Sequence, residues 1–434
     1  MEVFGEISSE EVNSLVKRYC DDKSRSLDDF KIESYIVRTS GDNPQGFLGV
    51  HYFLEINLCE ISDPPDGRVK LKYFVKKVPK SVDSFIQYID DLEVFKKECS
   101  LFKEVLPQLL NVNSEYGKFC PECYHVDMNL VILEDLADQK FQIRSSPGQL
   151  LDYPYLLCAM KALANMHSAS VVLERKLQSR LIDLYPTYLI ENAFPDWDAN
   201  SPRSNSLLNA LKVICSLIEI IPKYKDSPEL PKIVETYQKR FRQMPEFART
   251  SARFRNVFLH GDLWANNLMF KYDSQGSPIE CKLVDFQLSR YGPPALDIVT
   301  LLNVTTTSAF RKDYFDVLLE NYYQFFDDFL NAHDMNVNDL FTKVEFKESI
   351  NYYRIFGSLI SCFLSHETLL PSEIKDSLYT NSEIFKEFST GDRGKFCRRA
   401  FEVDPLYRER MSDMIMDMVD NFILTEHCEV AISS

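Results

Sequence analysis

Three polar residues, His260, Asp262 and Asn267, stand in a short stretch between two apolar runs. This arrangement is typical of a tight loop that joins two buried segments. A further apolar run ends in Asp285, and the turn-forming residues 273–278 separate it from the first stretch. We therefore predict a hairpin that brings Asp262, Asn267 and Asp285 to one edge of the fold.

Two carboxylates and one carboxamide at such an edge could do chemistry on an oxygen-rich substrate. Their hard oxygen atoms suit Mg²⁺, and one carboxylate could accept the proton of a substrate hydroxyl. Polar loops also contain Asp and Asn for a simpler reason, because these side chains hydrogen-bond to the local backbone of turns. The spacing, together with the second Asp after another apolar run, favours a functional site.

The spacing His-x-Asp-x-x-x-x-Asn that begins at His260, followed by Asp-Phe-Gln from Asp285, resembles the catalytic and metal loops of the protein-kinase-like fold. The full loop, His-Gly-Asp-Leu-Trp-Ala-Asn-Asn, is similar to that of the ecdysteroid kinase-like family, a choline-kinase-like family known mainly from insects. Protein kinases usually carry Lys where Trp264 stands, and this difference favours a small-molecule kinase.

The resemblance implies an α+β, bilobal fold of the aminoglycoside phosphotransferase and choline kinase type. We expect a small β-rich lobe over residues 1–136 and a large helical lobe over residues 137–434. Alternating apolar residues predict strands at 31–38 and 51–58. The loop between them, residues 41–49, contains several glycines but lacks the Gly-x-Gly-x-x-Gly pattern. The resemblance places this loop over the phosphates of ATP.

The third expected strand carries several lysines. Lys76 and Lys77 are adjacent, so only one of them can face a cleft. The resemblance selects Lys76, two residues before an apolar-Pro pair, as the group that holds the ATP phosphates. It selects Glu98, on a helix expected over residues 84–106, as the partner of that Lys. Glu93 and Glu104 remain alternatives for the partner, and a solvated row of lysines remains an alternative for the strand.

Residues 129–136 form an apolar run that ends in two carboxylates and a leucine. The family's Leu-Glu-Asp-Leu is present here unchanged, and the resemblance makes this segment the hinge between the lobes. The backbone of Glu134, Asp135 and Leu136 would then hydrogen-bond the adenine of ATP.

The expected helical lobe contains two further residues that we assign to structure rather than to chemistry. His167 lies on a helix predicted over residues 153–173, and we interpret it as a hydrogen-bonded structural histidine. Asp297, in a Pro-x-x-Asp-Leu turn, is implied by the resemblance to support the catalytic loop, which His260 would also brace. Residues 174–255 are predicted to be mainly helical, and in similar kinases such an insert contributes to the acceptor site.

Composition limits the partners that the chain can have. The formal net charge of −16 repels nucleic acids and anionic membranes. An odd count of 11 scattered cysteines fits reduced thiols in a cell, and we interpret Cys120 and Cys123 as ordinary thiols. The first residues lack a signal-peptide pattern, and no uncharged apolar run approaches about 18 residues. We expect a cytoplasmic monomer that neither binds nucleic acid nor inserts into a membrane.

The activity implied by the resemblance is transfer of the γ-phosphoryl group of ATP, with Mg²⁺, to an alcohol. Asp262 would orient the hydroxyl and accept its proton, and Asn267 and Asp285 would hold Mg²⁺. The implied acceptor is an ecdysteroid or a similar hydrophobic, hydroxylated compound. Three alternatives stay open: a choline or amino-sugar kinase, a protein kinase, and a catalytically silent binding protein. The presence of Lys76 together with the loop residues argues against the silent protein.

Overall fold

A computed structural model describes most of the chain, namely residues 7–39, 50–61, 67–78, 93–112, 117–195, 197 and 202–425. The glycine-containing loop and the first part of the helix expected over residues 84–106 lie outside the described residues. The chain divides into two compact units, the first made of Met1–Asn111 with Cys120–Gln142, and the second of Val112–Phe119 with Ile143–Ser434.

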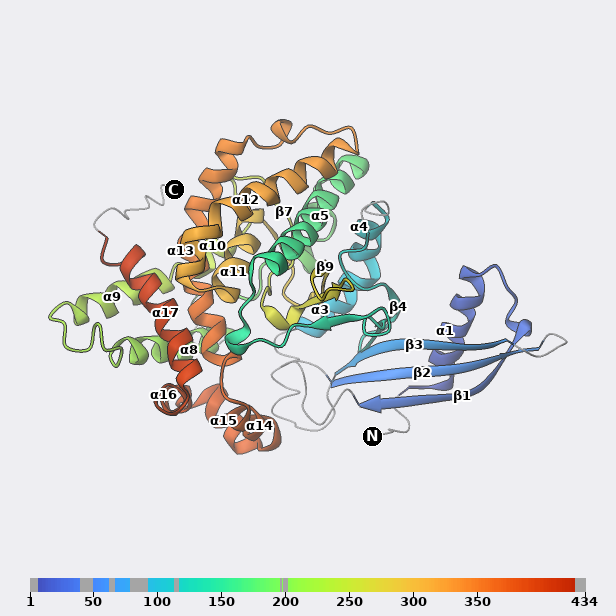
Figure 1. Cartoon of the computed structure of the whole chain (residues 1–434), viewed down its shortest axis with the longest axis horizontal. Coiled ribbons are helices and arrows are strands. Elements are labelled where there is room, and N and C mark those ends of the chain that lie inside the picture. The colour runs from blue at the N-terminus through green and yellow to red at the C-terminus, as the bar shows by residue number, and fades with distance from the viewer. Residues whose placement is uncertain are drawn as a thin grey trace. The chain divides into compact units, whose positions relative to one another are not determined.

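The first unit is built on a five-stranded antiparallel sheet in the order β1-β2-β3-β5-β4 (Figure 1). Its strands are β1 (Phe30–Thr39), β2 (Val50–Glu60), β3 (Arg68–Lys77), β4 (Cys123–Val126) and β5 (Leu130–Glu134). The strands predicted at 31–38 and 51–58 are confirmed as β1 and β2, and the lysine-rich run is β3. Alternate residues of β2 are buried, as expected for a strand with one face on a core.

Helix α1 (Ser9–Asp22) covers one face of this sheet. Ser8 and Glu11 form a capping box that satisfies backbone N–H groups at the helix start. The apolar face of α1 packs on the sheet through Val12, Leu15, Val16 and Cys20. A short 3-10 turn (Leu27–Asp29) precedes β1. The described part of the helical segment between β3 and β4 consists of α3 (Val94–Ser100), a π-helical turn (Leu101–Val105) and α4 (Leu106–Val112).

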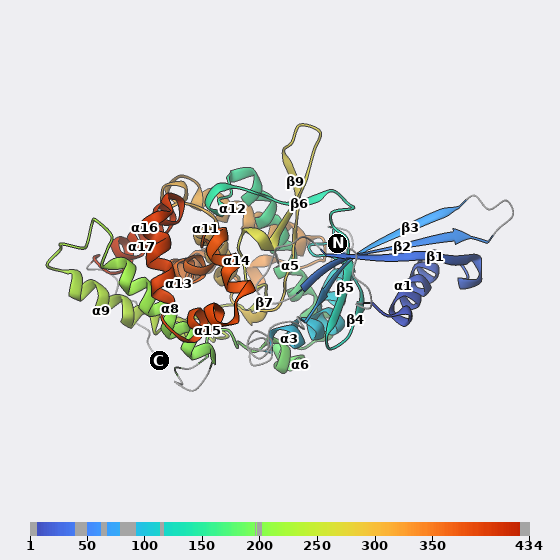
Figure 2. The same ribbon diagram turned by 90° about the horizontal axis from the view of Figure 1, so that it is seen from below.

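The second unit is mainly helical. Helix α5 (Tyr153–Leu177) lies beside α12 (Ser308–Asn331), and α11 (Pro294–Thr305) lies beside α13 (Lys343–Thr368). Helices α8, α13, α16 and α17 pack on one another (Figure 2). The remaining bounds are α6 (Leu181–Leu184), α7 (Pro186–Leu189), α8 (Pro202–Ile218), α9 (Leu230–Phe241), α10 (Met244–Ala248), α14 (Ser372–Thr380), α15 (Ser382–Thr390), α16 (Arg393–Val403) and α17 (Pro405–Phe422).

Helix α5 is long and apolar enough to cross a membrane, but 83% of its most apolar window is buried within the protein. Burial of this kind is what the central helix of a folded helical unit requires. The helix predicted over residues 153–173 is confirmed and extends by one further turn.

Short strands in the second unit flank the loop that contains His260, Asp262 and Asn267. Strand β7 (Val257–Leu259) pairs with β10 (Arg290–Gly292), and β8 (Leu268–Tyr272) pairs with β9 (Pro278–Leu283). The register places Leu268 opposite Leu283, so the predicted hairpin is confirmed. A further short strand, β6 (Phe141–Ile143), precedes α5. The α+β class is thereby confirmed.

Candidate active site

The hairpin aligns Asn267 with the residue that precedes Asp285. Asn267 ends a 3-10 turn (Ala265–Asn267) immediately before β8. Asp285 is the second residue after the end of β9. The Val284 N–H donates a hydrogen bond of 3.0 Å to the carbonyl oxygen of Asn267. This backbone bond brings Asn267 and Asp285 to the same end of the hairpin.

Asp262 is joined directly to Asn267. The Asn267 Nδ2 group donates to the Asp262 carbonyl oxygen at 2.8 Å and to its Oδ2 atom at 3.1 Å. Both side chains are largely buried, at 7% and 4% exposure. Because the amide donors are used to hold Asp262, Oδ1 of Asn267 is the atom of that side chain that could bind a cation.

His260 contacts the residue after β9 through one ring nitrogen and the backbone of its own loop through the other. Nε2 lies 3.0 Å from the Val284 carbonyl oxygen, and Nδ1 lies 3.3 Å from the Asp262 N–H. A carbonyl can only accept and an N–H can only donate, so the neutral tautomer with a proton on Nε2 satisfies both contacts. Burial lowers the pKa of His260 although Asp297 opposes the change, which keeps the ring neutral. His260 is therefore placed to brace the loop.

Asp297, in the first turn of α11, supports the loop backbone. Its Oδ2 atom accepts from the His260 N–H at 2.7 Å, and its Oδ1 atom accepts from the Gly261 N–H at 3.0 Å. His167 Nε2 lies 3.2 Å from the same carboxylate, and His167 Nδ1 lies 2.7 Å from the Tyr322 hydroxyl. Burial raises the pKa of Asp297, but the hydrogen bond from His167 and the basic groups around the carboxylate, including Arg290, together lower it below its usual value. The structural roles predicted for Asp297 and His167 are confirmed.

The loop contains two left-handed backbone conformations. Gly261 has φ of 82°, and a Cβ atom there would lie 2.2 Å from the Leu288 carbonyl oxygen. Asp285 has φ of 69°, which is uncommon for a residue with a side chain, although Asp tolerates it better than most. Strained conformations of this kind concentrate at functional sites.

In the first unit, Lys76 pairs with Glu98. Lys76 Nζ lies 2.7 Å from Glu98 Oε2, and the side chains are only 7% and 2% exposed. Of the glutamates left open by sequence, Glu93 is exposed and pairs with Lys96 of its own helix. The structure therefore brings Glu98 to Lys76, and a solvated row of lysines does not describe this end of β3.

The predicted adenine-binding segment forms the end of β5 and the turn after it. The Glu134 N–H donates to the Glu122 carbonyl oxygen at 2.9 Å, and the Leu136 carbonyl accepts from the Phe141 N–H at 2.9 Å. The Asp135 carboxylate accepts from the Ala137 N–H at 3.0 Å, and burial raises its pKa. Asp135 and the Leu136 carbonyl are thus used within the turn.

A comparison with protein-family models identifies the chain. The model of the ecdysteroid kinase-like family matches residues 48–335, which is more than half of the chain. The chain belongs to the ecdysteroid kinase-like family. The match includes the Lys76–Glu98 pair of this kinase-like protein. It also includes His260, Asp262, Asn267 and Asp285, and it confirms the family that the loop sequence resembled.

Comparison with solved structures adds only distant likenesses of this ecdysteroid kinase-like protein. A choline/ethanolamine kinase family protein from Mesorhizobium loti is 12% identical, with 83% of this chain and 90% of that chain covered and a TM-score of 0.33. A spectinomycin phosphotransferase in complex with ADP and spectinomycin is 10% identical, with 94% of this chain and 99% of that chain covered and a TM-score of 0.38. A choline kinase from Streptococcus pneumoniae is 14% identical, with 93% of this chain and 98% of that chain covered and a TM-score of 0.32. No curated protein matches the chain. These similarities are too low to support an argument about this site.

The sequence did not reveal a buried arginine of this family member that contacts the loop between His260 and Asn267. Arg290 is 2% exposed, its Nη1 lies 3.5 Å from the Gly261 carbonyl oxygen, and its Nε lies 3.0 Å from Glu191 Oε2. Glu191 also accepts from the N–H groups of Ala193 and Phe194. The only sequence signal was the position of Arg290 just after Asp-Phe-Gln, because its partner Glu191 lies far earlier in the chain.

A cavity of about 200 Å³ lies elsewhere in the second unit. It is lined by Arg253, Phe254, Arg255, Phe341, Phe346 and neighbouring residues, and by none of the predicted catalytic or metal-binding residues. We therefore do not assign it to the phosphotransfer site.

Proposed function

We propose that this ecdysteroid kinase-like protein transfers the γ-phosphoryl group of ATP to a hydroxyl group of a small molecule. The observation that carries the proposal is the hydrogen bond from Asn267 to Asp262 at the end of the hairpin that also carries Asp285. It joins the proposed proton acceptor to one proposed Mg²⁺ ligand, and the backbone bond between Val284 and Asn267 places the other ligand, Asp285, at the same end of the hairpin. Kinase-type transfer to a small molecule is the class of activity that family membership supports.

Asp262 is the residue we propose to bind the acceptor hydroxyl. Its carboxylate would orient the hydroxyl oxygen and accept the proton as the new bond to phosphorus forms. Phosphoryl transfer proceeds through a loose transition state that requires positioning more than a strong base. The bonds from Asn267, and from Asp297 through the loop backbone, supply this positioning.

The residues present fit Mg²⁺. Oδ1 of Asn267 and the carboxylate of Asp285 are both hard oxygen donors, which Mg²⁺ prefers to nitrogen and sulfur. We propose that these two side chains hold the ion. When bound, Mg²⁺ neutralises charge on the phosphates of ATP.

The first unit supplies the residues we propose for ATP. Lys76 would hold the α- and β-phosphates, and Glu98, at 2.7 Å, keeps its ammonium group in a fixed position. The backbone of Glu134 to Leu136 would hold adenine. The Leu136 N–H, which donates to no described residue, is the group of this turn best suited to an adenine nitrogen.

For the acceptor we propose an ecdysteroid or a similar hydrophobic, hydroxylated compound, as the family suggests. Choline or an amino sugar is the alternative among small-molecule substrates. A choline site would need aromatic and acidic side chains around a cation. A catalytically silent protein would be expected to have lost one of Lys76, Asp262, Asn267 or Asp285, and all four are present.

The test is acceptor-dependent consumption of ATP by the purified protein with Mg²⁺ across ecdysteroids, choline, aminoglycosides and phenolic glycosides. Asp262→Asn should lower turnover by at least about 100-fold, because a proton acceptor contributes about 10²–10⁴-fold. Its affinity for Mg·ATP, measured by thermal shift, should stay within a few-fold. Asp273→Asn, in the exposed turn of the same hairpin, is the matched control and should keep wild-type turnover.

Two outcomes would contradict the proposal. Wild-type turnover in Asp262→Asn would remove Asp262 from the reaction. A wild-type protein that gives no thermal shift with Mg·ATP would favour the silent binding protein.

A further inference from the structure

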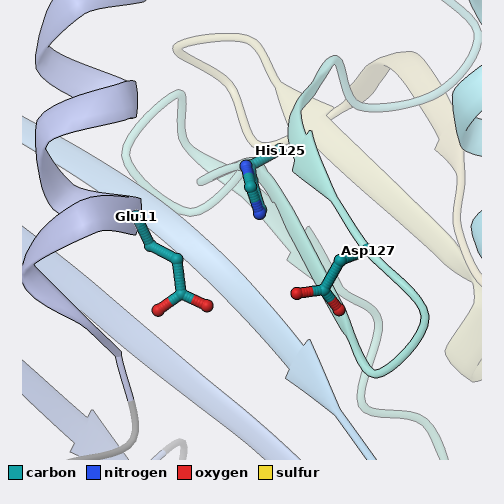
Figure 3. A group of neighbouring side chains, drawn as sticks. All are labelled: Glu11, His125 and Asp127. Carbon is teal, nitrogen blue, oxygen red and sulfur yellow. The ribbon is translucent and has the colours of Figure 1, made fainter.

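Three side chains of the first unit, Glu11, His125 and Asp127, converge at a place that the proposed phosphotransfer does not use. One ligand atom from each lies within 4.8 Å of the other two. Figure 3 shows the three side chains pointing toward one another, Glu11 from α1 and the other two from β4 and the residues after it. We propose that they form a binding site for a divalent transition-metal ion such as Zn²⁺.

The backbone places these groups without help from an ion. His125 lies on β4 and Asp127 directly follows the end of that strand, and their side chains lie on the side that faces Glu11. Glu11 lies in the first turn of α1, which faces that segment. Each residue is thus positioned by its element.

A separate set of contacts fixes α1 against β4. The Arg18 Nη1 group donates to the Cys123 carbonyl oxygen at 2.6 Å, and Arg18 Nη2 lies 2.6 Å from Glu122 Oε1. The guanidinium also lies 4.5 Å from the centre of the Tyr124 ring. Because Arg18 holds the two elements together, the distance between Glu11 and the two β4-side residues is set independently of any cation.

The two carboxylates are oriented by backbone hydrogen bonds that leave one oxygen of each for an ion. Glu11 Oε2 accepts from the Ser8 N–H in the capping box, and Asp127 Oδ1 accepts from the Asn129 N–H at 2.7 Å. The His125 ring forms no hydrogen bond or ion pair with any residue that the structure describes. Bonds that hold the ligating carboxylates are a regular feature of metal sites.

The donor set selects the class of ion. One imidazole nitrogen and two carboxylate oxygens suit Zn²⁺, Co²⁺ or Mn²⁺, whereas Mg²⁺ and Ca²⁺ prefer oxygen alone. Ligand atoms that all lie within 4.8 Å of one another can reach a single ion at bond lengths of about 2.0–2.2 Å with small side-chain adjustments. The ion would also relieve repulsion between the two carboxylates. Asp127 is exposed and the other two are half-buried, so an ion can enter from solvent.

Such an ion would clamp the start of α1 to β4 and stabilise the first unit. The chain offers substitutions that remove a ligand but keep the local fold. Glu11→Gln preserves the capping box, which accepts Glu or Gln at this position. Asp127→Asn preserves an oxygen for the Asn129 N–H, and His125→Gln removes the imidazole. Glu10→Gln, on the exposed neighbour of Glu11, is the matched control for charge.

The experiment uses the full-length protein, stripped with chelator and titrated with Zn²⁺ and Co²⁺ in excess Mg²⁺. We expect one ion per chain, a rise in Tm with ion concentration, and a Co²⁺ spectrum without a thiolate charge-transfer band. Each ligand variant should bind at least about tenfold more weakly. Glu10→Gln should bind as the wild type does, and in chelator no variant should have a Tm below that of the wild type.

Three results would overturn the proposal. The first is no binding by the wild type. The second is equal weakening by Glu10→Gln and Glu11→Gln, which would mean that only surface charge attracts the ion. The third is a thiolate band that survives in His125→Gln, which would assign the ion to cysteines.

Discussion

At the scale of single residues, two proposed site contacts are buried, namely the Lys76–Glu98 ion pair and the hydrogen bond from Asn267 to Asp262. Burial of Lys76 and Glu98 removes two charges from water, and their attraction rarely repays the whole of that cost. Replacing such a pair by apolar groups is often neutral for stability, so the pair is better explained by function than by folding. Asp262 is also buried, and its carboxylate accepts a hydrogen bond from the Asn267 amide.

Stability and activity should therefore separate at the Lys76–Glu98 pair. Lys76→Met alone should destabilise the first unit by about 3–5 kcal/mol, because Glu98 loses its cationic partner in a buried place. The double variant Lys76→Met/Glu98→Gln should recover part of that loss in urea unfolding, yet show no recovery of turnover. Recovery of turnover in the double variant would show that Lys76 does not act on ATP.

At the scale of elements, the catalytic loop depends on a backbone conformation as much as on side chains. Gly261 lies between His260 and Asp262, and its N–H is bound by Asp297. Its φ of 82° and the nearby Leu288 carbonyl oxygen leave no room for a side chain. The loop geometry thus requires glycine between the bracing histidine and the proposed proton acceptor.

Gly261→Ala should disturb this loop, and Gly276 offers a matched control. Gly276 has the same φ of 82°, in the turn of the β8–β9 hairpin, but a Cβ atom there meets nothing within 4 Å. Gly276→Ala should cost only the left-handed strain of about 1–2 kcal/mol and keep turnover. Gly261→Ala adds a backbone clash, so it should cost more in urea unfolding and lower turnover by at least about tenfold. Equal effects of the two variants would contradict this account.

At the scale of the whole molecule, two buried histidines of the second unit, His366 and His260, should make its stability depend on pH. Burial and the charge of Arg393 lower the pKa of His366 to about 3. Burial lowers the pKa of His260 as well. Both folded-state pKa values lie below the value of about 6.5 for an unfolded histidine. Below about pH 6.5 the unfolded chain therefore binds more protons than the folded chain does.

The free energy of unfolding should therefore fall as pH drops below about 6.5, and its full value should be present above that pH. His366→Gln should reduce the slope of unfolding free energy against pH by up to about 1.4 kcal/mol per pH unit between pH 4 and pH 6. Urea unfolding of the wild type and variant across this range measures the difference. Identical slopes would show that His366 does not remain neutral in the folded protein.

The sequence alone determined the features that depend on neighbours along the chain. Apolar alternation predicted β1 and β2, and two apolar runs with a turn between them predicted the β8–β9 hairpin and hence the approach of Asn267 and Asp285. The loop sequence also identified the family. These predictions succeeded because each depends on local periodicity or on a short, closed loop.

Tertiary structure decided the contacts between segments that lie far apart in the sequence. It formed the ion pair between Lys76 and Glu98, the partner that the resemblance had selected, paired Arg290 with Glu191, and brought Glu11 to His125 and Asp127. No periodicity encodes such pairs, because they depend on how packed helices and strands place the side chains. The charge state of His260 was decided in the same way, since burial and hydrogen-bond partners exist only in the folded chain.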